Sequence, residues 1–113
     1  MMDATLYHII VYVPMTHADA VRKALANAGA GRIGLYDSCS FSSHGVGRFR
    51  PLKGANPAVG TEGELETVDE ERIEAVIPED ADPKKVLMAV RAVHPYEEPA
   101  IHLLPMADDK KFL

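Results

Sequence analysis

The chain of 113 residues, with 47% hydrophobic and 26% charged residues, has the length and composition of one globular domain, which excludes a disordered or fibrous protein. Its formal net charge of -5 gives no general attraction to nucleic acid, and no apolar run is long enough to span a membrane. The single cysteine, Cys39, excludes an internal disulfide. We therefore expect one domain over residues 1–113, located in the cytoplasm, with no nucleic-acid or membrane partner.

The first half of the chain predicts a strand, a helix and a second strand. Residues 6–13 are nearly continuously apolar and rich in β-branched side chains, which indicates a strand buried on much of both faces. Within residues 16–31, apolar residues recur at helical spacing, at Ala18, Val21, Leu25 and Ala28. From Arg32 to Ser43 the side chains alternate in character, which predicts the second strand.

A long excursion separates the two halves of the chain. Residues 44–63 are dense in glycine and proline, a composition that predicts turns and at most short strands. Connections of this length are uncommon inside a compact domain and often carry function. The excursion is therefore a candidate binding loop.

The second half predicts a strand, a helix and a strand again. Residues 64–78 alternate charged and apolar side chains, which predicts one long strand or two strands with a break in the middle. A helix follows over 82–93, with Pro83 suited to its first turn. The last strand is expected over 100–106, before a polar tail over 107–113.

Strand, helix and strand thus occur twice in the same order. The segment IIVYVP at 9–14 also resembles IEAVIP at 73–78, and each precedes a helix. Two such βαβ units predict an α+β, ferredoxin-like fold, with a four-stranded, mostly antiparallel sheet and both helices on one face. The other face must then be covered, either by the excursion or by another copy of the chain.

Three segments carry a resemblance to a known family: GAGRIGLYDSCSF, GVGRFRPLKGANPAVG and HPYEEPA. With their spacing, they make residues 7–106 similar to the inserted domain of the Nif-three-like family, and to stand-alone proteins made of that domain. The resemblance implies a CutA/PII-like variant of the ferredoxin-like fold, which typically assembles as a trimer around packed sheets. Full-length members carry a paired metal site on their other, larger domain, whose ligands this sequence lacks, so their hydrolase activity is not implied here.

The segment HPYEEPA supports two interpretations. His94 and Glu97 are spaced to face one divalent metal ion in a helical turn, and Glu98 would complete an oxygen-rich corner. Alternatively, Pro95 ends the preceding helix, while the carboxylates are solvated and Tyr96 packs against the fold. A divalent metal held by His94, Glu97 and Glu98 is the cofactor hypothesis that follows.

The glycine-rich excursion also supports two interpretations. Its glycines permit close approach of the backbone to a ligand, and its arginines and lysine suit an anion. Alternatively, the glycines serve turns, and the loop packs against a neighbouring subunit. We expect a pocket that joins the strand from Arg32, this loop and HPYEEPA across a subunit boundary. Its predicted ligand-binding residues are Tyr36, Ser38, Ser40, His44, Arg48, Arg50, Asn56 and Tyr96.

Cys39 lies between two serines and near His44, which raises the idea of a thiolate nucleophile. However, it shares its predicted strand face with Leu35 and Phe41, where a cysteine behaves as a small hydrophobic residue. The sequence therefore predicts a core cysteine and assigns no catalytic residue.

The sequence favours a small module without catalytic turnover, which binds a small ligand, a metal ion or a protein partner and forms a homo-oligomer, with a trimer expected. One alternative is a metal-dependent hydrolase built from His44, His94, Glu97 and Glu98. A second alternative is a purely structural oligomerisation unit.

Overall fold

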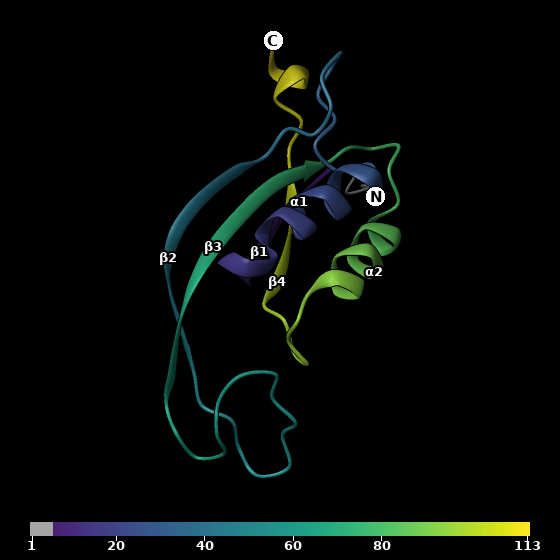
Figure 1. Cartoon of the computed structure of the whole chain (residues 1–113). Coiled ribbons are helices and arrows are strands. Elements are labelled where there is room, and N and C mark those ends of the chain that lie inside the picture. The colour runs from purple at the N-terminus through teal and green to yellow at the C-terminus, as the bar shows by residue number, and fades with distance from the viewer. Residues whose placement is uncertain (1–5) are drawn as a thin grey trace.

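The computed structural model describes residues 6–113 and has the predicted α+β, ferredoxin-like architecture (Figure 1). Four strands form one antiparallel sheet in the order β2-β3-β1-β4. The elements in chain order are β1 (Leu6–Pro14), η1 (Met15–His17), α1 (Ala18–Asn27), β2 (Phe41–Phe49), β3 (Glu66–Ile77), α2 (Pro83–Val93), β4 (Ile101–Met106) and η2 (Asp109–Phe112). No helix within residues 6–113 is long and apolar enough to cross a membrane.

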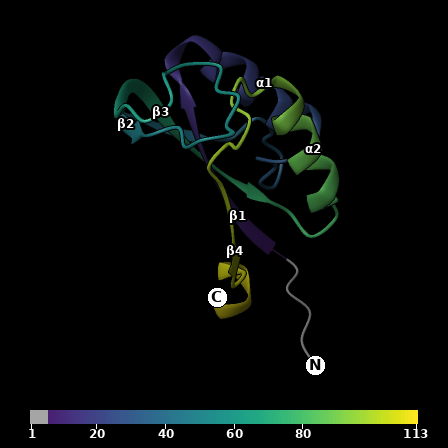
Figure 2. The ribbon, with the colours of Figure 1, turned by 90° about the horizontal axis from the view of Figure 1, so that it is seen from below.

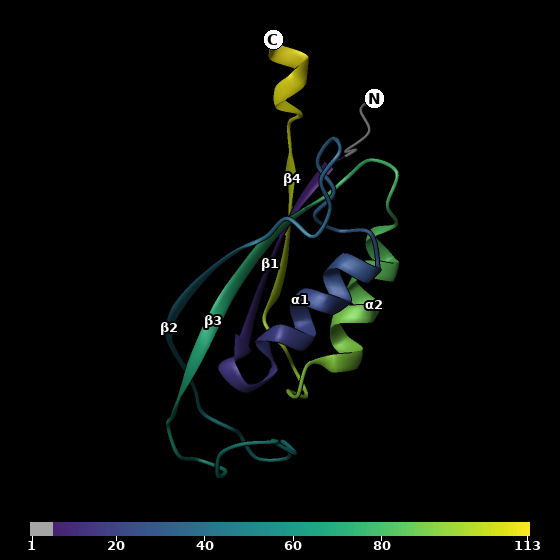
Figure 3. The same ribbon diagram turned by 45° about the horizontal axis from the view of Figure 1, so that its top comes forward.

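One face of the sheet packs against α1 and α2, which lie on the same side of it (Figure 3). The buried core residues are Ile9, Val11 and Val13 of β1, Val21 and Leu25 of α1, Ile73 and Ile77 of β3, and Val86 and Val90 of α2. Burial of each such side chain stabilises the fold by about 1.5–3 kcal/mol relative to exposure. The helical stripes predicted from the sequence are thus the ones that face the sheet.

The opposite face of the sheet, called the open face below, carries no helix. Every second side chain of each strand points to this face. Phe41 (66% exposed) and Leu104 (49% exposed) are among them. Its centre is polar, because His8 contacts Glu74 at 2.8 Å and the Arg72 guanidinium lies over the Tyr12 ring. The open face therefore combines exposed apolar side chains with a row of charged ones.

Residues 31–40 do not form the strand that the sequence predicts. Ile33 and Tyr36 exchange backbone hydrogen bonds of 2.8 and 2.9 Å, which closes a tight turn. Gly34 and Ser38 adopt positive φ angles of 57° and 60°, which an extended strand does not allow. Leu35 at the tip is fully exposed, so the alternation of side chains does not mark a buried face.

The prediction that Cys39 belongs to the core is wrong for the same reason. Cys39 follows the turn, is only partly buried and lies outside the core cluster. Its expected neighbours Leu35 and Phe41 are both exposed.

The second strand begins later than predicted and extends into the excursion. β2 pairs with β3 from Phe41 opposite Glu74 to Phe49 opposite Glu66, so residues 44–49 are strand and not loop. Glycines at 45 and 47 obscured this strand in the sequence, because glycine disfavours strands on average. The irregular loop is therefore confined to residues 50–65.

The second half of the chain follows the prediction closely. β3 is one continuous strand. The Asp82 side chain caps α2 by accepting a hydrogen bond of 3.0 Å from Lys84 N, and Pro83 occupies the first turn. The helix ends at Val93, because His94 precedes Pro95 and takes an extended conformation. This ending places HPYEEPA beside the sheet.

Candidate functional site

The glycine-containing segments lie at opposite ends of β2 (Figure 1), and Figure 2 shows the second of them beside the chain that follows α2. The turn over residues 31–40, called the turn end below, precedes the first residue of β2. The loop over residues 50–65 follows its last residue, and folds back towards residues 94–100. The loop and residues 94–100 together are called the loop end.

A cavity of about 560 Å³ opens at the loop end. Most of its wall is apolar, and charged side chains are distributed among the apolar ones. It is lined by Tyr12, Gly47, Arg48, Phe49, Arg50, Pro51, Leu52, Ala55, Pro57, Ala58, Val59, Glu70, Tyr96, Glu97, Glu98 and Ala100. A concave, largely apolar site with a few polar groups has the character of a small-molecule pocket.

His94 anchors HPYEEPA to the sheet. Its Nε2 donates a hydrogen bond of 2.7 Å to the Tyr12 carbonyl oxygen, so Nδ1 is free to accept one of 3.2 Å from Tyr96 N. The residue is 7% exposed, and burial lowers the pKa of His94, which favours the neutral ring that this arrangement requires. Since both ring nitrogens are engaged, His94 acts as a structural residue here and does not favour metal binding.

Tyr96 joins the segment to the cavity wall. Its ring packs against Phe49, with 5.6 Å between the ring centroids, and its hydroxyl donates a hydrogen bond of 3.1 Å to Glu70 Oε2. Burial, together with the charge of Glu70, raises the pKa of Tyr96, so the phenol stays protonated and acts as a donor.

The loop reaches the same segment through its backbone. Asn56 N donates a hydrogen bond of 3.2 Å to Glu97 Oε1. The loop closes on itself where Gly63 N donates to the carbonyl oxygen of the buried Pro51, at 2.7 Å. The glycine-rich loop and HPYEEPA therefore form two walls of one cavity.

Glu70 is a cavity residue that sequence reasoning did not single out. It is 8% exposed and lies on the open face of β3, next to Gly47 of β2. A Cβ at position 47 would lie 2.2 Å from Glu70 Oε1, so the glycine leaves the space that the carboxylate fills. The sequence signal for this buried glutamate is a glycine that lies near it on the neighbouring strand. That signal can be recognised only once the register of β2 and β3 is known.

Comparison with known proteins shows which longer proteins this chain is similar to. No family model matches it. The chain is 48% identical over 109 residues to the GTP cyclohydrolase 1 type 2 homolog of Halalkalibacterium halodurans, covering 96% of this chain and 29% of that protein. It also superposes on a NIF3-related protein of Bacillus cereus with a TM-score of 0.78 and 46% identity, over 91% of this chain and 26% of that one.

The chain is a CutA/PII-like module related to the NIF3 family. The CutA1 protein of Thermus thermophilus shares its fold, with a TM-score of 0.64 at 22% identity over 95% of this chain and 90% of that one. The module spans between a quarter and a third of the length of the curated relative described above. The activity in that relative's name belongs to the longer protein.

The structure separates the predicted ligand-binding residues of the module into two groups and a single residue, His44, which is described below. Tyr36, Ser38 and Ser40 are exposed at the turn end, away from the cavity. Arg48, Arg50 and Tyr96 line the cavity, and Asn56 lies in its loop. Within one chain, then, the cavity forms without the segment from Arg32 that was expected to contribute to it.

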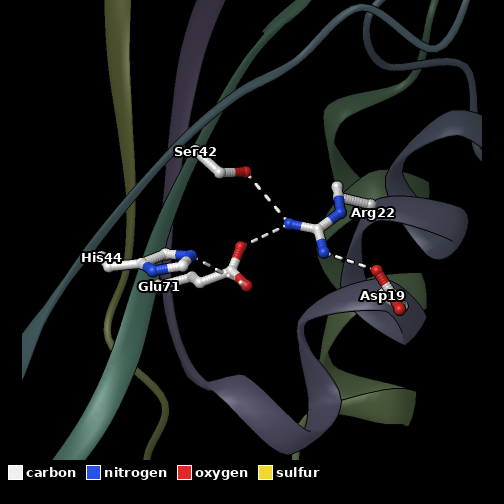
Figure 4. Close-up of polar contacts among 5 residues, drawn as sticks. All are labelled: Asp19, Arg22, Ser42, His44 and Glu71. Atoms are coloured by element: carbon white, nitrogen blue, oxygen red, sulfur yellow. Dashed lines mark hydrogen bonds and ion pairs between the residues drawn. The ribbon is translucent and has the colours of Figure 1, made fainter.

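His44 lies in a different cluster, between β2, β3 and α1 (Figure 4). Its Nε2 is 3.7 Å from the buried Glu71 carboxylate, which also accepts a hydrogen bond from Arg22 of α1. Arg22 further donates to Asp19 and Ser42. Its hydrogen bonds to the carboxylates of Asp19, first, and Glu71 raise the pKa of Arg22. The cluster ties α1 to the edge strand β2.

The residues of the hydrolase alternative are consequently not brought together. His44 faces Glu71, His94 is held by two hydrogen bonds, and Glu97 and Glu98 line the cavity. Within the described residues 6–113, no group of three histidine, cysteine, aspartate or glutamate side chains is arranged to hold a metal ion. Metal binding by His94, Glu97 and Glu98 stays a prediction that this geometry does not favour.

Proposed function

We propose that the chain is a cytoplasmic ligand-binding module without catalytic turnover, and that its cavity at the loop end binds a small organic molecule. The observation that carries the proposal is the meeting of HPYEEPA with the glycine-rich loop around this cavity. The volume of about 560 Å³ lies within the range of small-molecule sites. Long ordered loops on a rigid sheet commonly carry such sites.

The chemistry of the cavity wall supports binding over turnover. The residues that line it within the described chain include no serine, threonine, cysteine, histidine or lysine, so its carboxylates and tyrosines are the side chains left for a general base. Glu70 is the buried ionisable side chain of the wall, and its partner is a tyrosine hydroxyl. This composition suits recognition of a ligand.

A thermal-shift screen of small organic molecules tests the proposal. A ligand at 100 times its Kd adds about 2.7 kcal/mol to the stability of the folded state, which raises the Tm by several degrees. We expect hits to stabilise the wild type and Ala92→Trp, which alters an exposed residue of α2 outside the cavity. The cavity-filling variant Ala100→Trp should lose the shift. Equal shifts in both variants, or no hits, would contradict the proposal.

We further propose that the module assembles as a homo-oligomer through its open face, as the trimer that the resemblance implies. Support comes from the exposed apolar residues of that face, Phe41 and Leu104. Light scattering is expected to give the mass of a trimer for the wild type and for Met88→Glu on α2. Leu104→Glu should give a smaller species, because it buries a charge in the interface. A monomeric wild type would contradict this assembly.

A further inference from the structure

We propose that the cavity selects an organic cation, an ammonium group on an apolar body, and that Glu70 is the counter-charge that binds it. This inference rests on the proposed function of the cavity. It specifies the chemical class of the ligand.

The central observation is that Glu70 is a buried carboxylate without a cationic partner. It is 8% exposed, yet it forms no ion pair with any arginine, lysine or histidine among residues 6–113. A buried charge is costly unless a partner of opposite sign compensates it. A cation in the cavity would supply that compensation.

The Glu70 carboxylate also has an oxygen available to a ligand. Oε2 accepts the hydrogen bond of the Tyr96 hydroxyl, while Oε1 accepts none from residues 6–113. Since Oε1 has no hydrogen bond and is still not classed as fully enclosed, it retains some exposed surface. Glu70 lines the cavity. Gly47 leaves room for the carboxylate and the Tyr96 hydroxyl holds Oε2, so Oε1 is the oxygen that a ligand can address.

Aromatic rings surround this position. Phe49 and Tyr96 pack at 5.6 Å between ring centroids, and both line the cavity with Tyr12. The faces of aromatic rings attract cations, most strongly where water is excluded. Tyr12 already makes such a contact with Arg72, whose guanidinium carbon lies 5.8 Å from the ring centroid. The remaining rings and the apolar wall suit the body of the ligand.

The other charges of the cavity are consistent with this assignment. Arg48 and Arg50 line the cavity but are exposed, so solvent and salt weaken their repulsion of a cation, whereas the field of the buried Glu70 is weakened less. Glu97 and Glu98 do not converge with Glu70 into a metal-binding group within the described chain. The site therefore favours an organic cation over a metal ion.

Isothermal titration of the full chain with three probes tests the inference. The probes are 2-phenylethylammonium, the neutral 2-phenylethanol and the anionic 3-phenylpropanoate, which share an apolar ring and differ in charge. We expect the cation to bind on the order of tenfold more tightly than the neutral probe, because a charge-assisted hydrogen bond and a cation–π contact are added. The anion should bind most weakly.

Two variants and a control assign the effect to Glu70. Glu70→Gln keeps an oxygen for the Tyr96 hydroxyl but removes the charge, and should abolish the preference for the cation. Gly47→Ala keeps the charge but forces the carboxylate to move, because its Cβ would lie 2.2 Å from Oε1, and should also weaken cation binding. Glu79→Gln, a change at an exposed carboxylate outside the cavity, should preserve the preference. Circular dichroism verifies that each variant is folded.

The probes separate failure of this inference from failure of the proposed function. If the neutral or anionic probe binds as tightly as the cation, the cavity is a ligand site but the inference is wrong. If the preference for the cation persists in Glu70→Gln, the assignment to Glu70 is wrong. If no probe binds and the screen above gives no hits, the proposed function and the inference are both contradicted.

Discussion

The two ends of β2 use glycine for different purposes. At the turn end, Gly31 has a φ of 82°, and a Cβ there would lie 2.5 Å from the Cys39 carbonyl oxygen. At the loop end, Gly54 has a φ of 94°, but a Cβ there would meet no atom within 4 Å. Gly31 is required because a side chain would collide with the backbone of Cys39. Gly54 is favoured only because its φ is positive. Glycine content alone therefore does not identify a binding loop.

The largest effect that this comparison predicts is on stability. Gly31→Ala should lower the free energy of unfolding by about 3 kcal/mol or more, because both its φ and the clash with the backbone of Cys39 oppose it. The matched change Gly54→Ala should cost about 1 kcal/mol, the strain of a positive φ alone. Urea denaturation measures both values. Equal losses would show that the turn end is no more constrained than the loop end.

The anchoring of HPYEEPA predicts the next effect. His94→Ala should lower the free energy of unfolding by roughly 2–3 kcal/mol, because it leaves the Tyr12 carbonyl and Tyr96 N without their side-chain partners. His17→Ala, at an exposed position before α1, is the control and should cost well under 1 kcal/mol. A loss of metal without a loss of stability in His94→Ala would instead support the metal site.

The pH dependence of stability gives a third test. The pKa of His94 is lowered by burial in the folded protein, so the unfolded chain binds more protons below the ordinary value of 6.5. The contribution of the neutral His94 to the free energy of unfolding is complete above pH 6.5. It is lost as the pH falls from 6.5 towards the lower pKa that His94 has in the folded protein. We expect the free energy of unfolding to fall on acidification from pH 7 to pH 5, and to fall less in His94→Asn. An unchanged loss in the variant would exclude His94 as its source.

The smallest effect is expected at the tip of the turn end. Leu35→Ser should change the free energy of unfolding by less than about 0.5 kcal/mol, because Leu35 is fully exposed. It should also leave ligand binding unchanged, since Leu35 is not part of the cavity wall. A large loss of stability in Leu35→Ser, varying with protein concentration, would contradict this prediction. It would show that Leu35 is buried in an oligomer.

The sequence predicted most of the fold, because its regular elements follow hydrophobic periodicity. The stripe of Val21 and Leu25, and the capped helix after Asp82, face the sheet as expected. The region around Leu35 was misread, because exposed apolar residues in a turn alternate with polar ones just as a half-buried strand does. Ser38 also has a positive φ, which is uncommon for a residue other than glycine and is not evident from the composition of the segment.

The site was only partly predictable, because its residues come from four distant segments. HPYEEPA and the loop were recognisable by their residue types. Glu70 lies in a run of charged residues that reads as a solvated strand face, and its burial follows from the strand register beside Gly47 and from the Tyr96 hydroxyl above it. His44 illustrates the converse, because its residue type suggested the cavity while its strand face directs it to Glu71.

The claim that the loop end is the ligand site is tested most directly by amide chemical shifts in the ¹⁵N-labelled chain. During titration with 2-phenylethylammonium, we expect the shifts to move over residues 47–59 and 94–100 and to stay constant over 31–40. Changes confined to residues 31–40, or an absence of changes at both ends of β2, would contradict the account.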